Sequence, residues 1–184
     1  MYRLVVTIVL AAALSLTAGA DPRPTTSSRI AWRYETLSNY ISHRAAIGAD
    51  GTVYVNDSSG LLHALTPSGE LEWIYDGGSS GSAGPTVVGA DGTIYFGTSG
   101  PNSAIHGVNR DGSRKWIFQA PDSQGPIGGP GIGPDGNVYA IFDLPGSIGA
   151  VSLTPAGALR WNVLGDPRVA EYGQSGKELV FNSG

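Results

Sequence analysis

The chain has 184 residues, enough for one domain, and 15 acidic against 11 basic residues give it a formal charge of −4. Without a basic patch it is not expected to bind nucleic acid, and without cysteine it is not expected to carry disulfide bonds or a lipid anchor on a cysteine. Hydrophobic residues make up 41% of the chain, which excludes a disordered composition, and the 28 glycines indicate many turns.

The first 20 residues have the pattern of a secretory signal peptide. A single charge, Arg3, precedes an apolar stretch over 4–16 that is too short to span a bilayer comfortably. An A-x-A cleavage pattern follows at 18–20. We therefore predict cleavage after Ala20, a linker over 21–28, and a secreted or periplasmic mature chain without a membrane span. An uncleaved anchor is the alternative.

One eight-residue phrase occurs three times: IGADGTVY at 47–54, VGADGTIY at 88–95 and IGPDGNVY at 132–139. Each copy leads to a second phrase in which a glycine lies four residues before a tryptophan. These pairs are Gly69 and Trp73, Gly112 and Trp116, and Gly157 and Trp161. Together with Trp32, the tryptophans are 41, 43 and 45 residues apart, and such a period predicts a repeat architecture.

Each repeat is expected to form four short antiparallel strands. In the first repeat they cover 45–48, 52–56, 61–66 and 70–75, where β-branched, aromatic and alternating residues are separated by turn sequences. Aspartate followed by glycine suits the hairpin turns, since aspartate can bond its own backbone and glycine can adopt a positive φ. The expected turn residues are Asp50, Gly51, Asp91, Gly92, Asp135 and Gly136. A calcium loop is a weaker alternative, because each loop offers a single acid.

Four-stranded units of about 43 residues that stack around an axis form the blades of a β-propeller. We predict an all-β propeller with three complete blades at about 41–77, 85–119 and 128–164. Partial blades would supply strands at 29–35 and 168–182. So few blades suggest either a truncated reading frame or an arc that closes by self-association.

The pattern A-L-x-x-x-G-x-x-x-W after x-D-G-x-x-Y resembles the pyrroloquinoline-quinone-like (PQQ-like) propeller repeats over nearly all of 29–184. In that family the glycine-to-tryptophan motif docks neighbouring blades. The resemblance implies this structural role for Trp32, Gly69, Trp73, Gly112, Trp116, Gly157 and Trp161. Quinone enzymes of the family hold their cofactor on the axis of a full ring, beside calcium. We carry over no catalytic, cofactor-binding or metal-binding residue and expect no cofactor, because the chain lacks the cysteine pair of many such enzymes and any local cluster of acids and bases.

Other candidate motifs are explained by structure. His63 and His106 occupy equivalent repeat positions, consistent with a strand site that tolerates a half-buried ring, and no zinc-binding spacing is present. Residues 77–81 match G-x-S-x-G, but they lie in a predicted linker between blades. Residues 131–136 match G-x-G-x-x-G, but they begin a hairpin, whereas a dinucleotide site needs a helix.

The sequence favours an exported, non-enzymatic binding or scaffold module for a protein or a polysaccharide. The variable loops at 98–104 and 142–148 are the candidate binding loops. One alternative is a fragment of a larger quinoprotein dehydrogenase, or of another propeller enzyme, whose cofactor ligands lie outside this chain. Another is an envelope assembly factor resembling the outer-membrane biogenesis propeller, although that relative is a lipoprotein and this chain lacks the cysteine. Exposed blade edges also predict self-association.

Overall fold

The computed structural model describes residues 5–7 and 30–163, except 37, 39, 42, 121, 122, 124 and 127. Within these residues every regular element is a strand, and no helix is long and apolar enough to cross a membrane. The strand predicted at 168–182 and most of the predicted leader lie outside the described residues.

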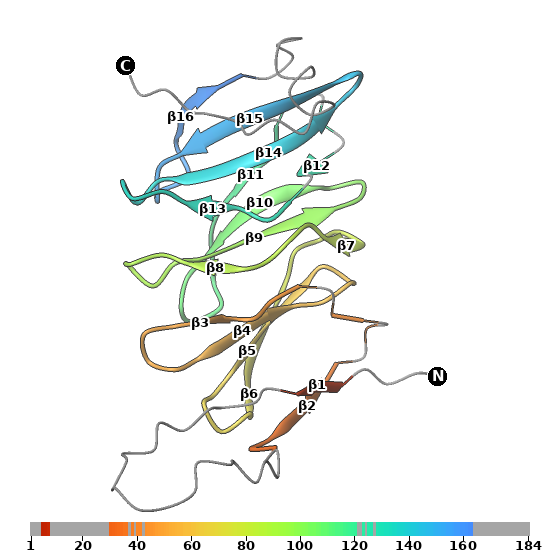
Figure 1. Cartoon of the computed structure of the whole chain (residues 1–184), viewed down its shortest axis with the longest axis vertical. Coiled ribbons are helices and arrows are strands. Elements are labelled where there is room, and N and C mark those ends of the chain that lie inside the picture. Colours follow the sequence, from red (N-terminus) through yellow and green to blue (C-terminus); the bar gives the residue numbers. More distant parts are fainter. Residues whose placement is uncertain are drawn as a thin grey trace, which may run out of the picture.

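Three antiparallel sheets follow one another along the chain, and each forms one blade (Figure 1). Blade 1 contains β3 (Ala46–Ile47), β4 (Val53–Asn56), β5 (Leu61–Leu65) and β6 (Leu71–Asp76). Blade 2 contains β7 (Gly81–Ser82), β8 (Val87–Val88), β9 (Ile94–Ser99), β10 (Ala104–Val108) and β11 (Arg114–Phe118). Blade 3 contains β12 (Gly125–Pro126), β13 (Gly131–Ile132), β14 (Val138–Leu144), β15 (Ser147–Leu153) and β16 (Leu159–Asn162). A separate pair joins β1 (Val5–Thr7) to β2 (Arg33–Glu35). The prediction of an all-β antiparallel architecture is confirmed.

The first strand of blades 2 and 3 is split into two pieces. Both β7 and β8 pair with β9, and both β12 and β13 pair with β14. In blade 2 the break contains Gly84, at φ 78°, followed by Pro85. An added Cβ on Gly84 would lie 1.7 Å from the backbone nitrogen of Gly129 in blade 3. The breaks therefore let the backbones of neighbouring blades approach very closely, which only glycine permits.

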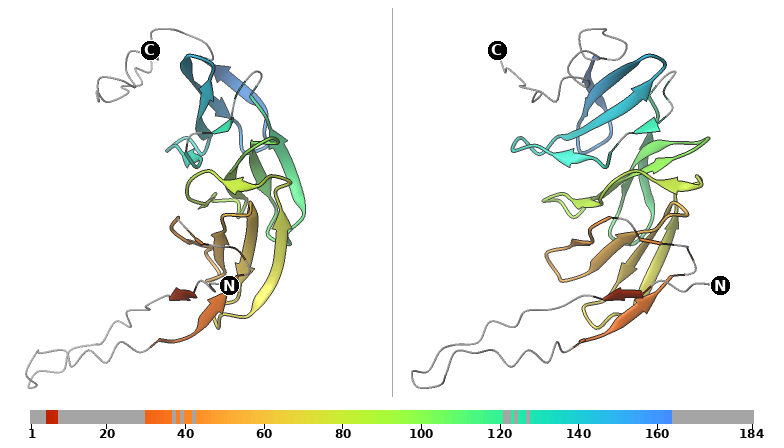
Figure 2. Two further views of the ribbon diagram at one scale, coloured as in Figure 1. Left: turned by 90° about the vertical axis from the view of Figure 1, so that its right-hand side faces the viewer. Right: turned by 45° about the vertical axis from the view of Figure 1, so that its right-hand side comes forward.

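The blades stack into an arc (Figure 2). The last strand of each blade, β6, β11 or β16, lies on the convex side, and the short first strands lie on the concave side. Turns between first and second strands gather along one face of the arc, and loops between second and third strands gather along the opposite face. We call the latter the loop face.

Apolar side chains between the sheets form the core. One cluster joins blades 1 and 2, with Tyr54, Leu62, Ile94, Phe96 and Val108 among its members. A second joins blades 2 and 3 and includes Tyr95, Ile105, Val138, Phe142 and Leu153. Because β4 and β9 have a neighbour on both faces, nearly all of their residues are buried, whereas β14 alternates between buried and exposed residues.

Candidate functional site: the loop face and the contacts beneath it

Each of the first three tryptophans lies against a glycine of the next blade. The Nε1–H groups of Trp32, Trp73 and Trp116 donate to the carbonyls of Pro67, Arg110 and Pro155 at 2.9, 3.0 and 3.0 Å. Two residues later stand Gly69, Gly112 and Gly157, with φ of 88°, 83° and 83°. An added Cβ on these glycines would come within 2.4 to 2.8 Å of the tryptophan ring. The motif thus gives each blade a flat socket for the preceding ring. Trp161 contacts Tyr139 of its own blade, with ring centroids 6.0 Å apart.

The aspartates of the repeated phrase hold their own turns. The carboxylates of Asp50, Asp91 and Asp135 accept the backbone N–H two residues on at 3.2, 3.0 and 3.1 Å, and Gly51, Gly92 and Gly136 have φ of 87°, 79° and 75°. The three carboxylates also pair with Arg110, Lys115 and Arg160. Hydrogen bonds from Thr52 and Asn137 lower the pKa of Asp50 and Asp135. Within the described residues no three acids or histidines cluster to hold a metal ion.

A buried chain of hydrogen bonds links β2 to blade 1. His63 bonds the Tyr34 hydroxyl through Nδ1 at 3.0 Å and the Asp57 carboxylate through Nε2 at 3.0 Å. Asp57 also accepts the N–H groups of Ser59 and Leu61 at 2.9 and 3.2 Å. Burial acts to raise the pKa of Asp57, but the hydrogen bonds from His63 and these two N–H groups outweigh burial and lower it. Burial and the charge of Asp57 raise the pKa of Tyr34. Asp57 is therefore an ionised carboxylate that is 1% exposed.

The same three positions recur in the other blades with different chemistry. Between blades 1 and 2, His106 bonds the Tyr75 hydroxyl at 3.2 Å and the Thr98 hydroxyl at 3.0 Å. Burial lowers the pKa of His106 to about 4. Between blades 2 and 3, the positions hold Phe118, Val151 and Phe142, which belong to the apolar core. The fold therefore tolerates charged, neutral polar or apolar side chains at these three equivalent positions.

The rings of His63 and His106, expected to be half-buried, are at most 3% exposed and use both ring nitrogens. Tyr34 and Asp57 were not among the expected site residues. The repeats themselves indicate that these positions are in contact. Tyr34 and Tyr75 are each followed by a histidine in the next blade, whereas Phe118 is followed by Val151.

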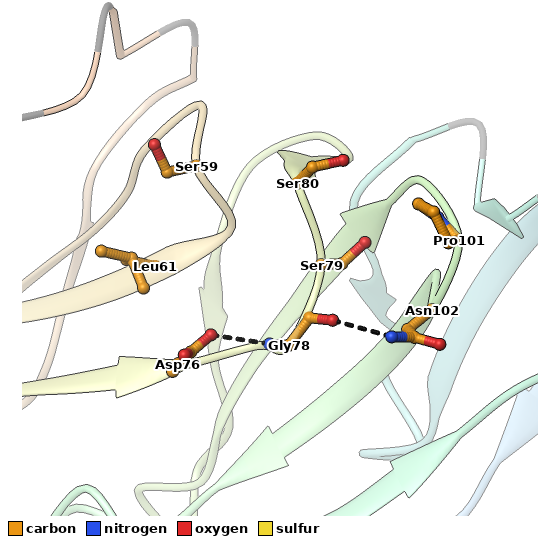
Figure 3. A pocket seen from close by; sticks show the side chains of 8 residues that line it. All are labelled: Ser59, Leu61, Asp76, Gly78, Ser79, Ser80, Pro101 and Asn102. Carbon is orange, nitrogen blue, oxygen red and sulfur yellow. Dashed lines mark hydrogen bonds between the residues drawn. The ribbon is translucent and has the colours of Figure 1, made fainter.

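Two adjoining depressions lie on the loop face and share Ser59 and Leu61. The smaller, of about 260 Å³, lies over the buried network and is also lined by Tyr34, Glu35, Thr36, Ser38, Asp57, His63 and Ile74. The larger, of about 500 Å³, lies where blade 1 meets blade 2 and is also lined by Asp76, Gly78, Ser79, Ser80, Pro101 and Asn102 (Figure 3). Carboxylates and hydroxyls line both depressions beside apolar groups such as Leu61, and the larger depression adds the Asn102 amide, so the face offers hydrogen-bonding groups next to apolar surface.

The larger depression is built around the connection from β6 to β7. Asp76 accepts the N–H of Gly78 at 2.8 Å, and the Gly78 carbonyl accepts the Asn102 amide at 3.1 Å (Figure 3). The Ser79 hydroxyl donates to the Ser99 carbonyl at 2.5 Å. These contacts hold the candidate binding loop 98–104 against the connection between blades.

The second candidate loop, 142–148, differs from expectation. Most of its residues belong to β14 and β15, which pair up to Leu144 and Ser147. Only Pro145 and Gly146 form the connection, and Gly146 has a φ of 76°. A two-residue turn with a positive φ suits a tight hairpin, so this segment extends the sheet and forms no open loop.

Comparisons with known proteins identify the repeats. Residues 21–182 match a family model described as outer membrane protein assembly factor BamB. No curated protein sequence matches the chain. Among solved structures, BamB from Moraxella catarrhalis has a similar fold, with a TM-score of 0.57 and 22% identity over 73% of this chain and 40% of that chain. Virginiamycin B lyase from Staphylococcus aureus has a TM-score of 0.60 and 20% identity, over 79% of this chain and 49% of that chain. A europium-containing methanol dehydrogenase has a TM-score of 0.61 and 16% identity, over 73% of this chain and 35% of that chain.

At these identities the structural likeness shows the fold alone, and the chain spans half or less of the length of the structures that it matches. The family match is broader, because it covers the three tryptophan sockets in one continuous stretch. The chain belongs to the PQQ-like β-propeller repeat family whose model is described as outer membrane protein assembly factor BamB.

Proposed function

We propose that the mature chain is an exported, non-enzymatic module that binds a protein or a polysaccharide on the loop face. The observation that carries the proposal is the pair of adjoining depressions, whose linings come from β2, blade 1 and blade 2. Such a surface lets variable loops bind a ligand while the tryptophan sockets hold the blades. Peptide groups and sugar hydroxyls both match its hydroxyl, carboxylate and amide groups.

The hydrogen bonds at this face support binding over acid–base catalysis. Both oxygens of Asp57 are occupied, by backbone N–H groups and by His63. One oxygen of Asp76 accepts the Gly78 N–H. Groups that are already used to shape loops are well placed to fix a surface and poorly placed to take a substrate proton.

The test is a binding screen of the mature chain against envelope polysaccharides and extended polypeptides. Replacing Ser80 and Asn102 together with alanine should weaken binding at least tenfold, because both line the larger depression. Ser68→Ala is the matched control, because Ser68 is exposed in a turn on the opposite face. Equal affinity of all three proteins for every ligand found would place binding elsewhere and contradict the proposal.

Export is part of the same proposal and rests on the leader pattern. The expected outcome is a secreted or periplasmic protein whose N-terminal residue is Asp21. Intact-mass measurement of the native protein tests this, since retention of residues 1–20 would indicate an uncleaved anchor.

Envelope assembly is the second candidate, favoured by the description of the matching family model. In a host with an outer membrane, loss of the chain would then lower the amount of folded outer membrane proteins, which gel mobility before and after heating measures. A quinoprotein fragment remains the enzyme alternative, and a downstream continuation of the reading frame with a quinone-binding set would support it.

A further inference from the structure

The two depressions of the loop face contain equivalent residues from consecutive repeats. Glu35 lines the smaller depression and Asp76 lines the larger one, and each lies three positions after the tryptophan that docks on the next blade. Ser59 and Asn102 also line the depressions, and each lies two residues before the third strand of its blade. The face therefore repeats one combination, an acid and a hydrogen-bonding side chain, at two successive junctions.

The fold does not require an acid at this position. At the junction of blades 2 and 3 the equivalent residue is Gln119, and the equivalent loop is the tight turn at Pro145 and Gly146. The two carboxylates are thus a property of the two depressions and not of the repeat itself.

Negative charge dominates both depressions. Their linings contain the carboxylates of Glu35, Asp57 and Asp76, and none of the described residues that line them is a lysine or an arginine. Asp57 is ionised beneath the smaller depression, where His63 is the one basic side chain in the lining. A positively charged ligand is therefore attracted to this face, whereas an acidic ligand is repelled.

Apolar surface lies beside these carboxylates. Leu61 lines both depressions, Pro101 lines the larger one, and Ile74, 47% exposed, lines the smaller one. A lysine or arginine side chain matches this combination, because its aliphatic stem covers apolar surface while its charged end stays beside a carboxylate in water. A neutral sugar lacks the charge, and an amino sugar lacks the aliphatic stem.

We infer that the loop face binds an extended polypeptide segment that places one lysine or arginine side chain in each depression, beside Glu35 and beside Asp76. This inference rests on the proposed function of the loop face and narrows its ligand to a basic polypeptide. Leu61 and Ser59, which both depressions share, contact the residues between the two basic side chains. Glu35 and Asp76 are then the residues that determine specificity.

The test measures the binding of fluorescein-labelled peptides to the full chain by anisotropy. The peptides contain two lysines joined by leucine–glycine spacers of increasing length, and matched series carry glutamine, glutamate or diaminopropionate in place of lysine. We expect lysine peptides of a preferred spacing to bind about tenfold more tightly than the glutamine series, with glutamate weaker still. Diaminopropionate keeps the charge but shortens the stem, so it should also bind more weakly than lysine. Added salt should weaken the binding of lysine peptides.

Variants of Asp76 test the role of its charge. Asp76→Asn retains an oxygen that can accept the Gly78 N–H, and it should weaken the binding of lysine peptides about fivefold. Asp76→Lys should shift the preference toward glutamate peptides. Asp111→Asn is the matched control, because Asp111 also accepts the N–H two residues on, from Ser113 at 2.9 Å, in a turn on the opposite face. It should leave peptide binding unchanged. Unchanged circular dichroism shows that the variants remain folded.

The outcomes separate this inference from the proposed function. If no lysine peptide binds, or if Asp76→Asn binds lysine peptides as the parent does, the inference is overturned. If a polysaccharide binds instead, and the double replacement of Ser80 and Asn102 weakens it, the proposed function stands while the inference fails. Amino-sugar oligomers that bind more tightly than every lysine peptide would likewise assign the face to a polysaccharide.

Discussion

At the scale of single residues, the three socket glycines combine a positive φ with a tryptophan ring that leaves no room for a Cβ. At Gly136 a φ of 75° alone favours glycine, because the space around it is open. Comparing substitutions at the two kinds of position therefore separates the effect of positive φ from that of contact with the tryptophan ring.

Gly112→Ala should destabilise the fold far more than Gly136→Ala. At position 112, the new methyl group meets the Trp73 ring at 2.8 Å in addition to the backbone strain at φ 83°. We expect a loss of about 3 kcal/mol in the free energy of unfolding, against about 1 kcal/mol at position 136, where only strain acts. Denaturant titration measures both. Equal losses would show that the ring contact adds nothing.

His106 should make the fold less stable in mild acid. Burial, followed by the charge of Arg114, lowers its pKa from 6.5 to about 4, so the unfolded chain takes up a proton at a higher pH than the folded chain does. The contribution of neutral His106 to the free energy of unfolding is complete above pH 6.5 and falls by about 3 kcal/mol as the pH drops to 4. Unfolding titrations at several pH values test this.

The double variant Tyr75→Phe, His106→Val is the control for that prediction, because it copies Phe118 and Val151 from the next interface. Thr98 keeps the backbone N–H of Ala104 as a partner at 3.2 Å. In the variant, the free energy of unfolding should change much less between pH 6.5 and pH 4. If it changes as steeply with pH in both proteins, the pH dependence comes from groups other than His106.

At the scale of elements, features set by the local sequence pattern could be predicted, whereas features set by contacts between blades could not. In blade 1 the alternation and turn residues placed four strands within about two residues of β3 to β6. The split first strands were missed, because the breaks at Gly84 and Gly129 are set by contact between blades, which local periodicity does not report. The Tyr34–His63–Asp57 network was missed for the same reason, since Tyr34 and His63 lie 29 residues apart.

Asp57→Thr should preserve the network between β2 and blade 1, because Thr98 performs the equivalent role in blade 2. Thr98 bonds His106 and accepts the N–H of Ala104. We expect Asp57→Thr to cost about 1 kcal/mol and Asp57→Val about 3 kcal/mol, since valine leaves the Nε2 of His63 and two backbone N–H groups without the partner that Asp57 provides. Thermal and denaturant unfolding compare the two. Equal losses would mean that the charge itself is required.

At the scale of the whole molecule, the two ends of the arc differ. Blade 1 is covered by β2 and the residue before it, since Tyr34 and Trp32 pack against Val53, Val55 and Leu65. In blade 3, Ile141 is 38% exposed, whereas Asn56, its equivalent in blade 1, is 1% exposed. Tyr139 is half-buried, whereas its equivalents Tyr54 and Tyr95 are at most 2% exposed. The sheet of blade 3 thus presents the surface that its predecessors bury against the next blade.

This surface supports the expectation that the chain self-associates. Ile141→Glu places a charge on it and should shift residues 21–184 toward monomer, because a carboxylate buried in a contact between copies loses its hydration. Ile117, 43% exposed on β11, is the matched control, since β11 lies on the convex side away from that surface. Light scattering on a sizing column measures the molar mass of the parent chain, Ile141→Glu and Ile117→Glu. A closed dimer of the parent would make ligand screening worthwhile on that assembly, whereas a stable monomeric parent with cooperative unfolding would refute self-association.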